Sequence, residues 1–112
     1  MIIFRIIMSV IPQKQKEVMQ TLLSMIETAG KEKGCLSFEV FCDIDGKTVF
    51  NLIEEWETRE DLDHHIRSER FSVLLGTRSL LVKPLEMKIY TVFYSEGIEV
   101  IDALRSKSNS KG

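Results

Sequence analysis

Hydrophobic and polar residues alternate with a period of two in four stretches of the chain, and this pattern predicts four β-strands. The stretches span residues 2–10, 35–43, 48–56 and 85–94. The second and third are separated by the Asp45-Gly46 pair, which is typical of a tight turn and predicts a hairpin. The third strand places four residues on one face: Phe50, Leu52, Glu54 and Trp56.

Helical spacing of apolar residues predicts helices between these strands. A first helix is predicted from residue 12 to residue 30 or 34. Thr58, three residues before Asp61, forms an N-cap pattern and predicts a second helix. Helical structure is expected to break near Ser68, to resume over 69–80 and to end before the last strand.

The predicted order of elements is β-α-β-β-α-β, which is the plan of a ferredoxin-like α+β fold. With 112 residues, the chain has the length of a single domain. We expect this domain to span residues 1–94. Residues 95–112 are expected to form a short C-terminal helix followed by a frayed polar tail.

In a ferredoxin-like domain the helices cover one face of the sheet, and the other face is expected to be polar. Here both faces are rich in apolar residues, so a homodimer is predicted in which two sheets pack face to face as a dimeric α+β barrel. Each subunit would then enclose a cavity. The residues that make the second face apolar are Ile3, Ile7, Phe41, Val49, Ile53, Tyr90, Val92 and Tyr94.

Composition narrows the classes of function. Fifteen Lys and Arg against seventeen Asp and Glu leave a net charge of -2, which argues against nucleic acid or an anionic membrane as a partner. No apolar stretch approaches the ~18 residues of a membrane helix. Cys35 and Cys42 lack a disulfide or zinc pattern and are expected to be reduced in a cytoplasmic protein. No metal-ligand cluster or phosphate-binding loop is present, so no cofactor is expected.

The most informative polar residues lie among apolar ones. Glu54 and Trp56 could place a carboxylate beside a flat aromatic wall in a cavity; the alternative is a core tryptophan with a glutamate at the surface. His65 could move a proton near neutral pH, or could be a surface histidine paired with neighbouring acids. Arg5 either extends to a sheet end or pairs with an acid such as Glu54 in the cavity.

Several strings together resemble the antibiotic biosynthesis monooxygenase (ABM) family over roughly residues 1–94. They are a Gly-Cys-Leu-Ser-Phe-Glu run within residues 33–40, the Glu54-Glu55-Trp56 triplet, and a histidine nine residues after the tryptophan, with Leu62 and Phe71 around it.

The resemblance implies a face-to-face homodimer with a buried cavity in each subunit. It also implies cofactor-independent oxygenation of a small aromatic or quinol-like substrate by O2. Glu54, Trp56 and His65 are the matching catalytic positions. Expected substrate contacts are Arg5, Phe38, Phe50, Leu52 and Leu62.

The chain also departs from two branches of this family. Members similar to anthrone oxygenases have an asparagine and a tyrosine where this chain has Leu52 and Leu62, and the haem-degrading members have an axial histidine where this chain has Leu74, Leu75 and Gly76. Two alternatives therefore stay open. One is a non-catalytic dimeric barrel that binds a small ligand, and the other is an isomerase of a small phosphorylated metabolite.

Overall fold

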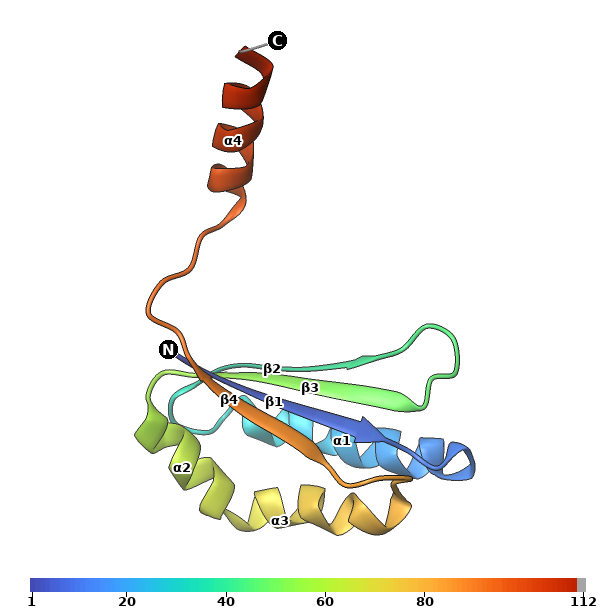
Figure 1. Cartoon of the computed structure of the whole chain (residues 1–112). Coiled ribbons are helices and arrows are strands. Elements are labelled where there is room, and N and C mark those ends of the chain that lie inside the picture. The colour runs from blue at the N-terminus through green and yellow to red at the C-terminus, as the bar shows by residue number, and fades with distance from the viewer. Residues whose placement is uncertain (111–112) are drawn as a thin grey trace.

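The computed structural model describes residues 1–110 and contains one four-stranded antiparallel sheet (Figure 1). The strands are β1 (Ile2–Ser9), β2 (Cys35–Cys42), β3 (Val49–Trp56) and β4 (Glu86–Thr91). Their order in the sheet is β2-β3-β1-β4, so β1 pairs with both β3 and β4 at the centre. This is the ferredoxin-like α+β fold predicted from the sequence.

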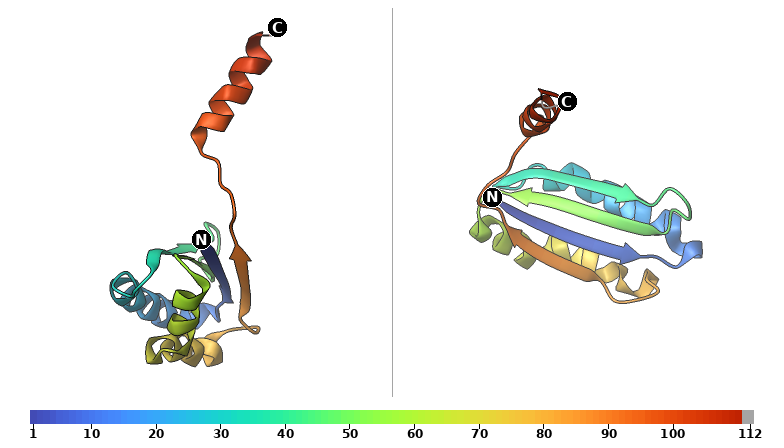
Figure 2. Two further views of the ribbon diagram at one scale, coloured as in Figure 1. Left: turned by 90° about the vertical axis from the view of Figure 1, so that its left-hand side faces the viewer. Right: turned by 45° about the horizontal axis from the view of Figure 1, so that its top comes forward.

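Helices cover one face of this sheet and leave the other free of helices, as Figures 1 and 2 show. They are α1 (Gln15–Ala29), preceded by the 3-10 helix η1 (Pro12–Lys14), then α2 (Arg59–Arg67), α3 (Glu69–Leu75) and the 3-10 helix η2 (Gly76–Leu80). The predicted break at Ser68 is confirmed, because its side chain caps α3 by accepting from the Phe71 N–H. Within the described residues, no helix is long and apolar enough to cross a membrane.

The hydrophobic core lies between the sheet and this helical layer. The period-two pattern of β1 and β3 sends every second side chain into it, and α1 contributes the stripe Val18, Leu22, Met25 and Ala29. A fully buried aliphatic or aromatic side chain contributes roughly 1.5–3 kcal/mol. The buried hydrophobic residues of the strands are Ile2, Phe4, Ile6, Met8, Phe38, Phe50, Leu52 and Trp56.

The hairpin and the start of β2 differ from the prediction. The connection spans residues 43–48 and is wider than a two-residue turn, because the Asp43 side chain accepts backbone N–H groups from Gly46, Thr48 and Val49, each at 2.9 Å. A register shift between Cys35 and Ser37 interrupts the alternation in β2.

The chain after β4 also departs from the prediction. β4 ends at Thr91 instead of residue 94, because β1 begins at Ile2 and no partner strand continues beyond it; the last link is Val92 N–H to the Met1 carbonyl at 2.9 Å. The C-terminal helix α4 (Ile98–Ser110) runs through most of the stretch expected to be a frayed tail. Residues 111–112 lie outside the described part of the chain.

Gly34 allows the segment before β2 to pass close to the start of α2. Its φ is +81°, and a Cβ atom there would lie 2.1 Å from Asp61 Oδ2 and 2.6 Å from Asp61 Cβ. The Gly34 carbonyl accepts the Glu57 N–H at 2.8 Å, which ties this segment to the end of β3. A side chain at this position would therefore push the segment away from α2.

We expect Gly34→Ala to lower the free energy of unfolding by roughly 1–3 kcal/mol, because it combines a strained left-handed backbone with a steric clash. Urea unfolding followed by tryptophan fluorescence measures this. Gly76→Ala is the matched control: Gly76 has a helical φ of -64°, and a Cβ atom added there would have nothing within 4 Å. Equal stability of the two variants would contradict the prediction.

Candidate active site

The alternation of β3 carries Glu54 and Trp56 onto the helix-covered face, where both are fully buried. The Trp56 indole Nε1–H donates to Glu54 Oε1 at 3.0 Å. Trp56 is thus a core tryptophan, but the alternative of a glutamate at the surface is wrong. A carboxyl group stands in the apolar core beside an aromatic ring.

The N-cap of α2 sets which side of that helix faces the sheet. Thr58 accepts a hydrogen bond from the Asp61 N–H, as the sequence pattern predicted, and Leu62 and His65 are then the buried residues of α2. The His65 ring lies 4.6 Å from the Trp56 ring, measured between centroids. The interpretation of His65 as a surface histidine is wrong, since it is only 2% exposed.

His65 lies between two carboxyl groups. Its Nδ1 contacts Glu32 Oε2 at 2.5 Å, and its Nε2 lies 3.3 Å from Glu54 Oε1, within ion-pair range but not aligned as a hydrogen bond. Glu54 Oε2 is buried and has no hydrogen-bond partner among the described residues. Glu32, His65 and Glu54 therefore form a continuous line of three titratable groups, here called the acid–histidine row.

Glu32 is the end of the acid–histidine row nearest the surface. Its side chain is 13% exposed, and Arg70 Nη1 donates to Glu32 Oε1 at 3.4 Å and to the Thr28 carbonyl at 3.3 Å. A charged hollow of about 500 Å³, lined also by Lys31 and Ser68, opens beside it. The row thus runs from this hollow into the core.

Sequence reasoning missed Glu32. It lies 33 residues before its partner His65, in the loop after α1, and nothing in the spacing connects the two. The signal that could have pointed to it is its place two residues before Gly34, whose positive φ marks a close approach to α2.

Burial sets the protonation states in the row. It raises the pKa of Glu54 to about 8, against a smaller opposing effect of the Trp56 N–H. Burial also lowers the pKa of His65, while the adjacent Glu32 carboxylate raises it and Arg70 lowers it. Near neutral pH, Glu54 is therefore protonated and His65 is neutral, with Nδ1–H held by Glu32. A proton on Glu54 then has the free Nε2 of His65 as its neighbour.

The thiol of Cys35 lies close to the row but is not activated by it. Burial raises the pKa of Cys35, and the nearby carboxyl groups of Glu54 and Glu32 raise it further. The group therefore stays a thiol near neutral pH. Cys35 is a small residue that is partly buried and packs against the core.

The predicted substrate contacts divide between the two faces of the sheet. Phe38, Leu52 and Leu62 lie in the core around the row, with the Phe38 ring edge-on to His65 at 6.4 Å between centroids. Phe50 is buried on the same face, four residues before Glu54 along β3.

Arg5 does not join the row. It lies on the helix-free face of the sheet, where it is exposed and donates from Nη2 to Asn51 Oδ1 at 3.2 Å. The reason is the alternation of β1: its neighbours Phe4 and Ile6 face the helices, so Arg5 faces the other way.

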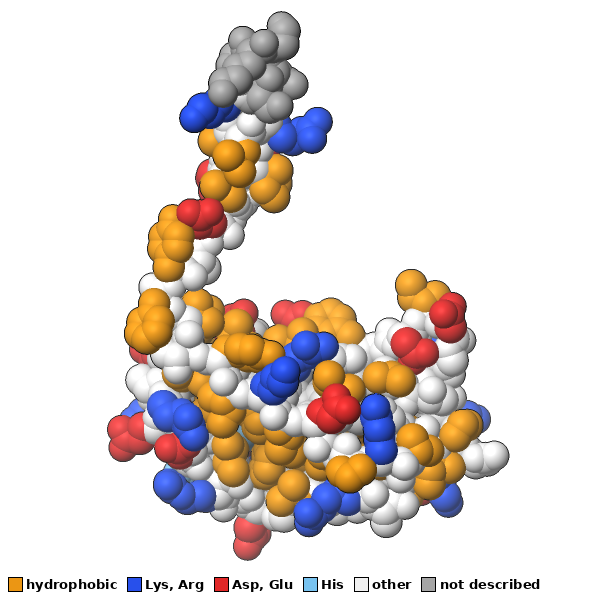
Figure 3. All heavy atoms as spheres, in the orientation of Figure 1, with side chains coloured by type: hydrophobic (Ala, Val, Ile, Leu, Met, Phe, Trp, Pro, Cys, Tyr) orange, Lys and Arg blue, Asp and Glu red, His pale blue; other side chains and the backbone are white. Residues whose placement is uncertain are grey.

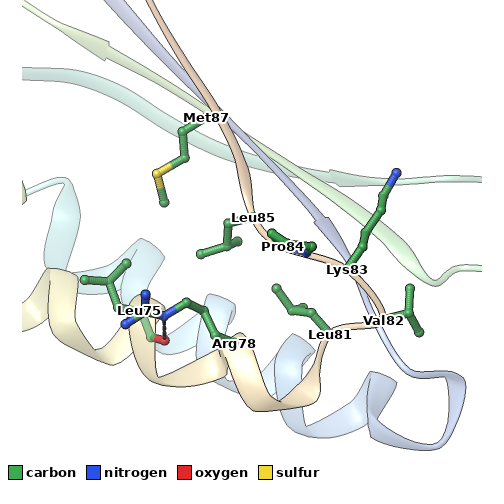
Figure 4. A pocket seen from close by; sticks show the side chains of 8 residues that line it. All are labelled: Leu75, Arg78, Leu81, Val82, Lys83, Pro84, Leu85 and Met87. Atoms are coloured by element: carbon green, nitrogen blue, oxygen red, sulfur yellow. Dashed lines mark hydrogen bonds between the residues drawn. The ribbon is translucent and has the colours of Figure 1, made fainter.

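An apolar groove of about 590 Å³ lies between α3–η2 and β4. Figure 4 shows Leu75, Leu85 and Met87 in the space between these elements, and in Figure 3 hydrophobic side chains gather along this side of the molecule. Leu75 lies one helical turn from Phe71, whose ring is 5.5 Å from the His65 ring. One turn of α3 and the buried Phe71 ring therefore separate the groove from His65.

The arrangement of the row does not suit a metal ion. Its two carboxyl groups meet different nitrogens of the His65 ring, so they do not converge on one point. Among residues 1–110 the structure has no group of three or more His, Cys, Asp or Glu side chains placed to hold one.

We expect the pH dependence of stability to report the buried carboxyl. The pKa of Glu54 is raised from 4.5 in the unfolded chain to about 8 in the folded protein. Below about pH 4.5 the group is protonated in both states and does not change the free energy of unfolding. Between pH 4.5 and pH 8 it ionises in the unfolded chain alone, so the free energy of unfolding falls by up to roughly 4 kcal/mol. Glu54→Gln should remove this fall in urea unfolding between pH 5 and about pH 9. Glu39→Gln, at an exposed position on β2, is the control for charge removal. Identical pH curves for wild type and Glu54→Gln would contradict the assignment.

Comparison with solved structures shows the same fold in several proteins. A conserved protein from Methanosarcina mazei Go1 shares 32% identity and a TM-score of 0.75, over 80% of this chain and 89% of that one. A proposed antibiotic biosynthesis monooxygenase from Deinococcus radiodurans has a TM-score of 0.80 at 20% identity, over 88% of this chain and 98% of that one.

A proposed antibiotic biosynthesis monooxygenase from Nitrosomonas europaea has a TM-score of 0.78 at 22% identity; the match covers 84% of this chain and 100% of that one, so about a sixth of this chain has no counterpart there. No curated protein matches the chain. The family model described as antibiotic biosynthesis monooxygenase matches residues 1–74, which contain β1 to β3 and the whole acid–histidine row. The chain belongs to the antibiotic biosynthesis monooxygenase family.

Proposed function

We propose that this protein is a cofactor-independent monooxygenase that oxidises a small aromatic or quinol-type substrate with O2. The observation that carries the proposal is the placement of neutral His65 between the Glu32 carboxylate and the protonated Glu54 in an apolar core. This arrangement supplies a buried base at His65 and a carboxylate, Glu32, that stabilises the imidazolium formed when His65 takes a proton, which is what a substrate that reacts directly with O2 requires.

In this reaction the substrate supplies the electrons. A base removes a proton from a phenolic hydroxyl, and the resulting electron-rich anion reduces O2. One oxygen atom enters the ring in place of hydrogen and the other leaves as water, so that a quinol becomes a hydroxyquinone. The protein needs to bind the anion, exclude water and move protons.

The residues of the row take distinct roles in this proposal. His65 accepts the substrate proton at Nε2, and Glu32 holds the ring in the required tautomer through Nδ1–H. The protonated Glu54 is a proton donor inside the core, and Trp56 orients Glu54 through its N–H and provides an aromatic wall. The substrate enters along the groove between α3 and β4 and reaches His65 when the Phe71 ring turns aside.

The proposed functional unit is a homodimer in the cytoplasm. The helix-free face of the sheet is a mixed surface, with the Arg5–Asn51 pair among apolar side chains. A second sheet packed on it would remove this apolar surface from water. The apolar residues of this face are Ile3, Ile7, Phe41, Val49, Ile53 and Tyr90.

We expect oxygen uptake with a panel of quinols and anthrone-like phenols, above a no-enzyme control for autoxidation. His65→Ala should lower kcat/KM by roughly 100-fold or more because the base is lost. Trp56→Phe should have a smaller effect, because it keeps the aromatic wall and loses the N–H to Glu54. His64→Ala, which changes the exposed neighbour, is the matched control. If the Trp56 and His65 variants both turned over a confirmed substrate as fast as the wild type, the assignment would be refuted. Thermal shifts with these compounds but no oxygen uptake would indicate a binding protein instead.

Glu32 and Arg70 should shift the pH profile in opposite directions. The Glu32 carboxylate raises the pKa of His65 and Arg70 lowers it. If His65 is the base, Glu32→Gln should move the acidic limb of kcat/KM to lower pH, and Arg70→Gln should move it to higher pH. Measuring kcat/KM from pH 5 to pH 9 tests both. A limb that moves in the same direction in both variants would exclude His65 as the titrating base.

A further inference from the structure

The C-terminal helix α4 stands apart from the rest of the chain, carried away by residues 92–97 (Figures 1 and 2). It rises on the side of the sheet that has no helices. Ile98, Ile101 and Leu104 recur three residues apart and form an apolar stripe along α4, with exposed fractions of 63%, 51% and 62%. The molecule thus presents a helix with an unpartnered apolar face.

Such a helix needs a surface to pack on. α4 has 13 residues, and isolated helices of this length are marginal in water without tertiary contacts. The segment before it exposes two aromatic side chains, Phe93 at 94% and Tyr94 at 77%. Aromatic side chains that lie together with most of their surface in water mark a site of interaction.

We propose that α4 is an arm that docks on a second copy of this chain. Its apolar stripe lies across the groove between α3–η2 and β4 of that copy, and the arms are exchanged by two-fold symmetry. The groove is thereby covered by a helix of the other subunit.

The reach of the segment fits this position. Six residues, 92–97, extend at most ~20 Å, whereas packed sheets lie ~10 Å apart. The segment is therefore long enough for α4 to begin beyond the sheet of the second copy, at the depth of its helical layer. Suppose that the two-fold axis lies between the two sheets and runs perpendicular to the strands. The β4 strands of the two copies then lie over each other in opposite directions, so the end of one is above the start of the other. Val82 and Leu85 line the groove at that start.

The two surfaces also match in chemistry. The groove exposes apolar side chains at its open side, including Val82 at 62% and Met87 at 38%. Arg78 lines the helical wall of the groove, and α4 carries Asp102 beside its stripe. Docking would bury apolar surface on both sides and bring an acidic side chain near a basic one.

Docking also has a consequence for the proposed oxygenase; this consequence rests on the proposed activity, as the position of the arm rests on the proposed face-to-face dimer. In a single chain, the groove by which the substrate is proposed to reach His65 is open to solvent. Covered by α4 of the second copy, it becomes a more enclosed pocket, and each site then depends on both subunits.

Disulfide trapping between two chains tests the contact. Both chains carry Cys35→Ser and Cys42→Ser, which removes the native thiols. One chain also carries Ile101→Cys and the other Met87→Cys; after mixing and mild oxidation we expect a covalent dimer of the two different chains. Ser106→Cys, on the opposite side of α4 from the stripe, replaces Ile101→Cys in the control and should be trapped at least 10-fold more slowly.

A second measurement needs no cysteine. Light scattering across a concentration series should show a dimer, and Ile101→Asp should weaken its association at least 10-fold, whereas Ser106→Asp should not. A monomer at all concentrations would overturn the proposal, as would equal trapping at positions 101 and 106. Trapping only within a chain that carries both Ile101→Cys and Met87→Cys would also overturn it, because α4 would then fold back on its own groove. None of these readouts depends on oxygen uptake, so the failure of the arm and the failure of the proposed activity are distinguishable.

Discussion

The carboxyl group of Glu54 in the apolar core is the constraint on which the rest of the site depends. A buried carboxylate without partners is costly, and Glu54 avoids this cost by staying protonated and by accepting the Trp56 N–H. His65 lies within ion-pair range of Glu54, and His65 is in turn held by Glu32. The polar side chain of Glu54 on β3 thereby requires polar partners from the elements that face it: His65 on α2 and Glu32 in the loop after α1.

Local backbone structure fixes the positions of His65 and Glu32. The Thr58 cap fixes where α2 begins and so turns His65 toward the sheet, and Gly34 lets the preceding loop come close enough for Glu32 to reach the ring. The result connects the core to the surface, because Glu32 and Arg70 border a charged hollow. Glu54, at the buried end of the row, is shielded from water, whereas Glu32, at the outer end, can exchange protons with water.

Two regions of the structure expose apolar surface to water. One region is the helix-free face of the sheet, and the other is the stripe of α4 with the two aromatic residues before it, Phe93 and Tyr94. Both lie on the same side of the sheet in Figure 1, so one second copy of the chain would cover both. The groove beside β4 gives α4 a place on that copy and links assembly to the site.

The sequence by itself determined most of the elements and that Glu54 and Trp56 share one face of β3, because period-two and helical patterns and the Thr58 cap are local properties. Only the tertiary structure decided the partners: Glu32 reaches His65 across 33 residues, Arg5 faces the helix-free side, and β4 ends where β1 offers no further pairing. These outcomes depend on which face the helices cover and on the register between strands. Neither is encoded within a single element, so local pattern alone left them open.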